Sequence, residues 1–210
     1  MTKRLVLIAL RLILGLLTLT AIGRQLSIQI QLGYSVLNFF SYFTILSNLF
    51  AGVVLIFSAL YLVKHRQPSV SGDLIRGAAV AGMALVGVVF AVLLRDVDLG
   101  PLLPWVNIVH HYIMPVAVVL DWLYQPPRTQ LVVKQILLWQ IFPLLYLAYV
   151  LIRGSVVSWY PYPFLDPAKM GGYGRVALYS LGIFVTFLVF SWLLVMPANR
   201  LNRKVALGAP

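Results

Sequence analysis

Long apolar stretches separated by short polar links run through the whole chain. Six stretches approach or exceed the roughly 20 residues that a helix needs to span a bilayer: residues 5–23, 37–62, 75–94, 104–124, 132–152 and 176–197. The links carry proline, glycine and charge, as in KHRQPSVSGD, RDVDLGP and YQPPR. The pattern contains no internal repeat and no separate soluble segment. We therefore predict an all-α integral membrane protein, with residues 1–210 forming a single six-helix transmembrane domain.

Composition agrees with a membrane protein. The chain is 61% hydrophobic and 10% charged, against about 45–50% and about 25% in soluble domains. A net charge of +11 would suggest nucleic acid for a soluble protein, but here the basic residues flank the apolar stretches. We therefore expect membrane lipids, and no nucleic acid, as partners. The absence of cysteine excludes disulfides and thiolate chemistry.

The basic residues also predict an orientation. Cytoplasmic ends of spans carry an excess of Lys and Arg, and placing the N-terminus inside gives ten basic residues on the cytoplasmic side and five outside. We therefore predict that both termini are cytoplasmic. The first apolar run is longer than a signal-peptide core and has no A-x-A-like site before Arg24, so we interpret it as an uncleaved span. The ten residues assigned inside are Lys3, Arg4, Lys64, Arg66, Arg76, Arg128, Lys134, Arg200, Arg203 and Lys204.

A polar stripe runs along the second predicted span, in the segment FFSYFTILSN. At about 100° per residue, Ser41, Thr44 and Asn48 lie within about 60° of one another. An unpaired polar group in hydrocarbon costs several kcal/mol, so this stripe should face the bundle interior. The structural alternative is that each hydroxyl bonds the carbonyl four residues earlier in its own helix.

The fourth predicted span, PWVNIVHHYIMPVAVVLDWLY, is more polar still. Four of its side chains share an arc of about 100°. Ionisable residues inside a membrane are costly and usually functional. The aspartate lies about 15 Å deeper than the second histidine, where Arg76 or Lys134 would pair with it, and Arg11 of the first span should snorkel or pair within the bundle. The four side chains are Asn107, His110, His111 and Asp121.

Thr44 and His111 lie at matched depth, each about 10 Å below the outer boundary. An imidazole that accepts the threonine proton would make the hydroxyl a nucleophile, and the same ring could protonate the leaving alkoxide. Asn107 could fix the ring tautomer, and Asn48 could donate to an oxyanion. The histidines could instead only hold helices together. We expect no metal and no cofactor, because adjacent histidines point about 100° apart.

The loop of residues 153–175 contains SWYPYPFLDPAKMGGYG. Its prolines stiffen it, and its aromatic residues suit the lipid headgroup level. Because the loop lies on the same side as the predicted site, Tyr162 and Phe164 would form either a lid or guide for an amphipathic substrate, or an aromatic belt.

Three segments, NFFSYFTILSN, HHYIMPVAVVLDWL and YPYPFLD, together resemble the bacterial branch of the androgen-induced protein family, which also contains the androgen-dependent regulator of tissue factor pathway inhibitor. The likeness runs from about residue 34 to residue 170. It implies an intramembrane threonine hydrolase in a bacterial inner membrane, since animal members cleave fatty acid esters of hydroxy fatty acids with one Thr and one His.

The family's threonine corresponds to Thr44. Its histidine corresponds to His111 when counted from the preceding Trp and Asn, and to His110 when counted back from the following Pro; we choose His111 because Asn107 lies one turn away. We expect substrate to be bound by Ser41, Asn48, Asn107, His110, Tyr162 and Phe164.

Two rival classes remain from the sequence. In a transporter or a small-molecule binding protein, the polar residues of the second and fourth spans would line a path that reaches both membrane faces. In a non-catalytic scaffold, the interior would be too tightly packed to hold a ligand. A pocket closed towards the cytoplasm would favour the hydrolase.

Overall fold

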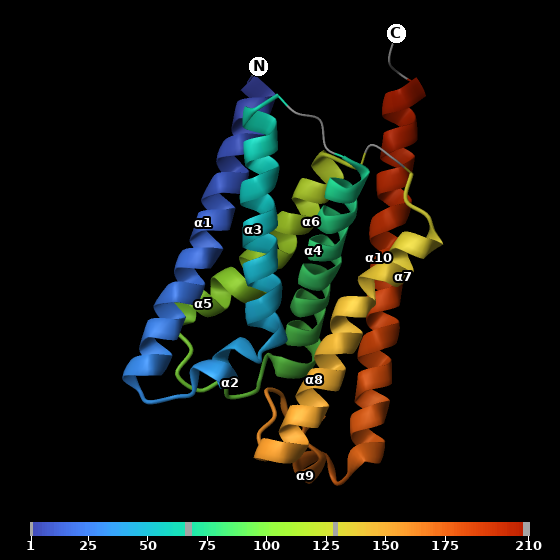
Figure 1. Cartoon of the computed structure of the whole chain (residues 1–210). Helices are drawn as coiled ribbons and strands as arrows, with labels where there is room; N and C mark the ends of the chain where they lie inside the picture. The colour runs from blue at the N-terminus through green and yellow to red at the C-terminus, as the bar shows by residue number, and fades with distance from the viewer. Residues whose placement is uncertain (1, 66–68, 128–129, 208–210) are drawn as a thin grey trace.

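The computed structural model describes residues 2–65, 69–127 and 130–207, with side chains to residue 201. Within these ranges the protein is all-α, without a strand (Figure 1). Six helical stretches in the same ranges are long and apolar enough to cross a membrane: Thr2–Gln31, Phe43–Val63, Val70–Leu94, Pro104–Tyr124, Val133–Val157 and Tyr173–Leu201. The predicted multi-pass bundle is confirmed. Arg66 and Arg128, used to predict the orientation, lie outside the described residues, as do the side chains of Arg203 and Lys204.

Helix α1 (Thr2–Gln31) is longer than the predicted span 5–23. Its extra turns stay helical although they are more polar, because the buried Gln25 amide pairs with the Pro101 carbonyl at 2.8 Å and the Leu103 N–H at 3.0 Å. The helix stops at Gly33, which has φ +75°. There the Tyr34 N–H bonds the Gln29 carbonyl at 2.9 Å, closing a Schellman turn.

The second predicted helix, 37–62, is two helices: α2 (Val36–Phe40) and α3 (Phe43–Val63). The chain is extended at Tyr42 (φ −80°, ψ 127°). Tyr146 of α8 (Ile141–Val157) stabilises this break. The Tyr146 hydroxyl donates to the Ser41 carbonyl at 2.9 Å and accepts from the Phe43 N–H at 3.2 Å. A side chain thus replaces hydrogen bonds that a continuous helix would make within itself.

Helix α4 (Val70–Val89) is the central helix and continues into the π-helical turn η1 (Phe90–Leu94). It packs against α3, α6 and α10. It starts before the predicted residue 75 because Ser69 caps it, accepting from the Gly72 N–H at 3.0 Å. Gly77 lies directly against the ring of Trp139, so the small residue permits close packing here.

Two prolines shape the next spans. The fourth consists of α5 (Pro104–Ile108), the π turn η2 (Val109–Ile113) and α6 (Met114–Tyr124). Pro115 has no N–H for the carbonyl of His111, which explains why the helix widens just before it. Pro143 likewise removes the bond to the Trp139 carbonyl, and there α7 (Val133–Trp139) ends and α8 begins after the kink at Gln140.

The last helix of the described residues is α10 (Tyr173–Leu207), which follows the short helices η3 (Pro163–Leu165) and α9 (Pro167–Met170). The start of α1 and the end of α10 lie at the same end of the bundle, and η3 and α9 lie at the opposite end (Figure 1). We call these the terminal end and the loop end.

A buried ionic cluster lies nearer the terminal end. Arg11 makes two bonds to the Asp121 carboxylate, at 2.7 and 2.9 Å. Arg76 reaches Asp121 and Asp73, both at 3.3 Å, and the Gln125 carbonyl at 2.9 Å. The expected pairing of Asp121 with Arg76, and that of Arg11 within the bundle, are both confirmed.

Candidate functional site

Thr44 lies in the first turn of α3, immediately after the break at Tyr42. Its backbone N–H donates to the Tyr162 hydroxyl at 3.2 Å, and its own hydroxyl lies 3.3 Å from the same oxygen. Because α3 begins only one residue earlier, the Thr44 hydroxyl has no helical carbonyl of its own four residues back. It therefore points to a tertiary partner instead of its own helix.

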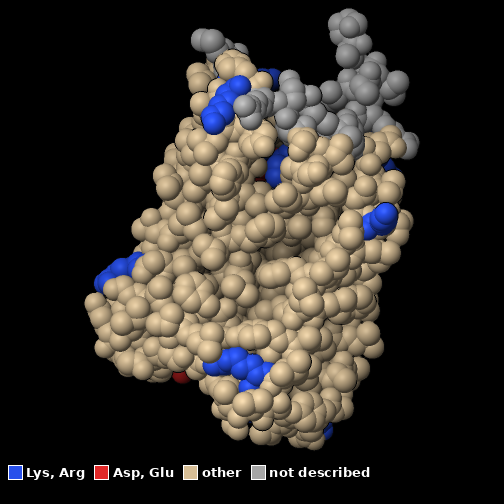
Figure 2. Space-filling model, viewed as in Figure 1, with Lys and Arg blue, Asp and Glu red and all other residues tan. Residues whose placement is uncertain are grey.

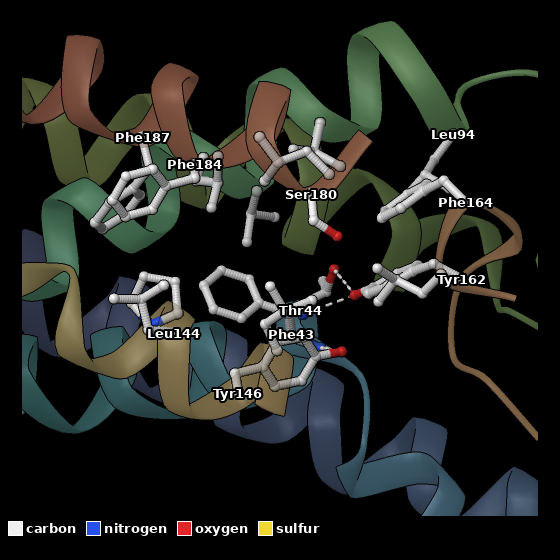
Figure 3. A pocket seen from close by; sticks show the side chains of 17 residues that line it. Phe43, Thr44, Leu94, Leu144, Tyr146, Tyr162, Phe164, Ser180, Phe184 and Phe187 are labelled. Carbon is white, nitrogen blue, oxygen red and sulfur yellow. Dashed lines mark hydrogen bonds between the residues drawn. The ribbon is translucent and has the colours of Figure 1, made fainter. Parts of the chain in front are cut away.

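The Thr44 hydroxyl faces an apolar pocket, which we call the Thr44 pocket (Figure 3). Its volume is about 80 Å³, and its walls come from α3, α4, α8, α10 and the loop around η3. Hydroxyl groups enter this lining only from Thr44, Tyr146, Tyr162 and Ser180 among the described residues. All other lining residues are hydrocarbon or aromatic, so the pocket is apolar apart from these hydroxyl groups.

Helices α8 and α10 bound one side of the Thr44 pocket. In the described residues these two helices approach each other closely in few places. Leu144 of α8 lines the pocket and is also 47% exposed on the bundle surface that would face lipid. On this side the pocket is therefore bounded by a side chain that is itself partly exposed on the bundle surface.

Tyr162 is held rigidly against Thr44. Its ring stacks on Phe164, with centroids 5.2 Å apart and 6° between planes, and meets the edge of Tyr42 at 5.7 Å. Burial raises the pKa of Tyr162 to about 12, although its hydrogen bonds from Thr44 act in the opposite direction. The hydroxyl thus stays neutral near pH 7 and keeps a proton to donate. Tyr162 and Phe164 are both in the pocket wall, and both are buried.

His111 lies in the π turn η2. Its Nδ1 is 2.6 Å from the Asn107 side-chain oxygen, and its ring stacks on Phe90, 4.1 Å between centroids. A side-chain carbonyl oxygen only accepts hydrogen bonds, so Nδ1 carries the proton and Nε2 carries the lone pair. The ring is therefore in the tautomer that a general base needs.

His110 is more deeply enclosed. Its Nε2 is buried without a hydrogen-bond partner among the described residues, and its ring lies within hydrogen-bonding reach of the Thr18 backbone. The Nε2 of His111 is not enclosed in this way. Of the two rings, His111 has the more available basic nitrogen.

Asn48 connects the histidine turn to Thr44. Its amide donates to the Thr44 carbonyl at 2.9 Å and to the His110 carbonyl at 3.3 Å, and its oxygen accepts from the Thr18 hydroxyl at 3.2 Å. These bonds are all within the protein, and the side chain is fully buried. Asn48 thus ties α3, η2 and α1 together, and this geometry directs no donor into the Thr44 pocket.

The structure brings together some of the predicted site residues and separates others. Thr44, Tyr162 and Phe164 share the pocket. Ser41 lies outside it and bonds the Leu37 carbonyl at 2.7 Å and the Tyr149 hydroxyl at 2.8 Å. In the part of the chain that the structure describes, neither imidazole lines the pocket and no hydrogen bond joins Thr44 to His110 or His111.

Two hydroxyls of the pocket were not predicted, Tyr146 and Ser180. Each is one polar residue in an apolar span, and neither belongs to a stripe. Tyr146 was in principle detectable, since a tyrosine in mid-span needs a partner for its hydroxyl. No known family, curated protein or solved structure matches the chain.

Proposed function

We propose that this protein is a membrane hydrolase of lipophilic, fatty-acyl esters, including fatty acid esters of hydroxy fatty acids, with Thr44 as the nucleophile and His111 as the general base. The observation that carries the proposal is the Thr44 hydroxyl, which faces an apolar pocket and has a neutral tyrosine hydroxyl beside it. The proposed location is a bacterial inner membrane, as the family resemblance implies, and the proposed orientation has both termini in the cytoplasm, as the flanking basic residues indicate.

In the proposed reaction the Thr44 oxygen attacks the ester carbonyl carbon, and its proton passes to Nε2 of His111. The imidazolium then protonates the departing alkoxide, leaving an acyl-threonine that water hydrolyses with the same ring as base. The Tyr162 hydroxyl and the positive end of α3 are suitably located to stabilise the oxyanion. The mechanism requires the His111 ring to leave its stack on Phe90 and reach Thr44 when substrate is bound.

The test uses the purified full-length protein in detergent, with a chromogenic long-chain ester and a fluorophosphonate probe. We expect Thr44→Ala and His111→Ala each to lower turnover at least about 100-fold, the usual contribution of a general base or its nucleophile. Thr44→Ser should retain part of the activity. Thr186→Ala is the matched control, because Thr186 bonds the carbonyl of Gly182 in its own helix at 2.8 Å.

Folded Thr44→Ala protein that turns over ester at the control rate would contradict the proposal. One observation supports a second function, namely binding of a lipophilic molecule without chemistry: the Thr44 hydroxyl contacts Tyr162 and neither imidazole. In that case the wild-type protein would bind a fluorescent long-chain ester and leave it intact. Thr44→Ala would change the affinity for this ester, and neither protein would hydrolyse it.

A further inference from the structure

A second cavity lies towards the terminal end of the bundle, between α3 and α4, and we call it the arginine cavity. Its volume is about 390 Å³, within the range of small-molecule sites. It shares no lining residue with the Thr44 pocket. Figure 2 shows a hollow in this face of the bundle, with a recessed basic side chain at its upper end.

The floor of this cavity is charged. Arg11 and Arg76 both line it, although they are only 2% and 6% exposed. Arg11 donates hydrogen bonds from Nε and Nη2 to the Asp121 carboxylate, and its Nη1 makes no hydrogen bond among the described residues. Because Nη1 itself is not fully enclosed, its protons are available to a ligand oxygen in the cavity.

Further donors surround the same space. The Ser69 hydroxyl lines it and accepts from the Gly72 N–H, which leaves its own proton free to donate into the cavity. Helix α4 starts here, so its positive end faces the cavity. At the rim, Arg4 bonds the Leu62 carbonyl at 2.6 Å. The lining arginines Arg11 and Arg76 are balanced by Asp73 and Asp121. The positive charge available to an anion is therefore that of Arg4, which lies beside the lining residue Leu62.

The walls are apolar and face outward. Phe57 and Tyr61 of α3 and Ile75 of α4 line the cavity and are 58%, 45% and 50% exposed. In a membrane these surfaces contact acyl chains. A soluble anion would gain nothing from them, whereas a lipid would place its headgroup on the arginines and its chains along these walls.

We propose that the arginine cavity binds the phosphate of an anionic glycerophospholipid from the leaflet at the terminal end. The phosphodiester oxygens accept hydrogen bonds from Arg11 Nη1 and the Ser69 hydroxyl, and the glycerol and acyl chains extend outward between α3 and α4. This site is independent of the proposed ester hydrolysis.

The experiment measures lipid binding to the full-length protein by native mass spectrometry, with thermal unfolding in detergent as a second readout. The probes are phosphatidylglycerol, phosphatidylcholine of the same chains, and glycerol phosphate. We expect one phosphatidylglycerol per chain, bound at least about tenfold more tightly than phosphatidylcholine, the effect of about one charge-assisted contact. Glycerol phosphate should bind far more weakly.

Two variants test the position. Arg11→Gln removes the Nη1 donor but also the two bonds to Asp121, so Ser58→Phe is used beside it. Ser58 lines the cavity outside the ionic cluster, and a phenyl ring there fills the space. We expect both to weaken phosphatidylglycerol binding at least about tenfold. Leu60→Phe, which adds the same ring on an exposed part of α3 outside the cavity, should have no effect.

Equal binding of the two phospholipids, or unchanged binding in folded Ser58→Phe, would overturn the site. Glycerol phosphate that binds as tightly as phosphatidylglycerol would overturn its assignment to a lipid and point to a soluble phosphate.

Discussion

Replacing Tyr162 by phenylalanine removes one oxygen from the Thr44 pocket and leaves the ring. The ring contacts with Phe164 and Tyr42 do not involve that oxygen, so they should persist. What is lost is the hydrogen bond from the Thr44 N–H at 3.2 Å and the one with the Thr44 hydroxyl at 3.3 Å. The N–H is in the first turn of α3 and has no helical acceptor.

The magnitude follows from that unpaired N–H. A buried donor left without a partner costs about 1–3 kcal/mol. We therefore expect Tyr162→Phe to lower the free energy of unfolding by about 1–3 kcal/mol, measured by denaturant titration in detergent micelles. Tyr160→Phe is the control, because its hydroxyl is exposed and lies 3.4 Å from that of Tyr173; it should change stability by less than about 0.5 kcal/mol.

Two further readouts follow from the same hydroxyl. If Tyr162 donates to the oxyanion of the proposed hydrolysis, Tyr162→Phe should lower kcat by about 10²–10³ and change KM little. The pKa of Tyr162 is raised by burial to about 12, above an unfolded value near 10. Its contribution to stability is therefore complete below about pH 10 and lost between about pH 10 and 12. In Tyr162→Phe the free energy of unfolding should therefore fall less between about pH 10 and 12 than it does in the wild-type protein. A variant as stable as the Tyr160 control, with the same alkaline profile as wild type, would refute the reasoning.

The remaining predictions concern packing and charge. Asp121→Leu leaves Arg11 without its carboxylate and should destabilise by about 3–5 kcal/mol, whereas Arg11→Leu leaves Asp121 with Arg76 at 3.3 Å and should cost less, about 1–3 kcal/mol. Chemical unfolding of both variants decides this, and equal losses would show that the Arg76 contact contributes nothing. Gly77→Ala places a methyl group against the α7 tryptophan ring and should cost about 1–3 kcal/mol. Gly82→Ala, whose added carbon would meet its nearest neighbour at 3.6 Å, is the control and should be nearly neutral.

Hydropathy alone was sufficient to predict the six spans, because a chain in lipid must satisfy its backbone hydrogen bonds internally and therefore forms helices. It did not reveal the break at Tyr42. That break depends on Tyr146 and Tyr162, about a hundred residues away, whose hydroxyls replace helical hydrogen bonds. Such a long-range substitution has no local signature.

The candidate site was partly accessible from the sequence. Depth and helical phase placed Thr44 towards the interior, and the structure puts its hydroxyl in a pocket. The same reasoning could not fix the imidazoles, since the π turn before Pro115 changes the helical phase at His110 and His111. It also predicted Tyr162 only as a lid or headgroup-level residue, whereas the aromatic stack holds it in the pocket wall.

The position of Leu144, between the Thr44 pocket and the bundle surface, has a kinetic consequence for the proposed function. A molecule that enters beside Leu144 arrives by lateral diffusion in the bilayer, so its effective concentration is its mole fraction in the membrane and not its amount in water. Diluting such a molecule with inert lipid at constant total amount should then slow its capture in proportion. Assays in vesicles would report this surface dilution, which measurements in free solution would conceal.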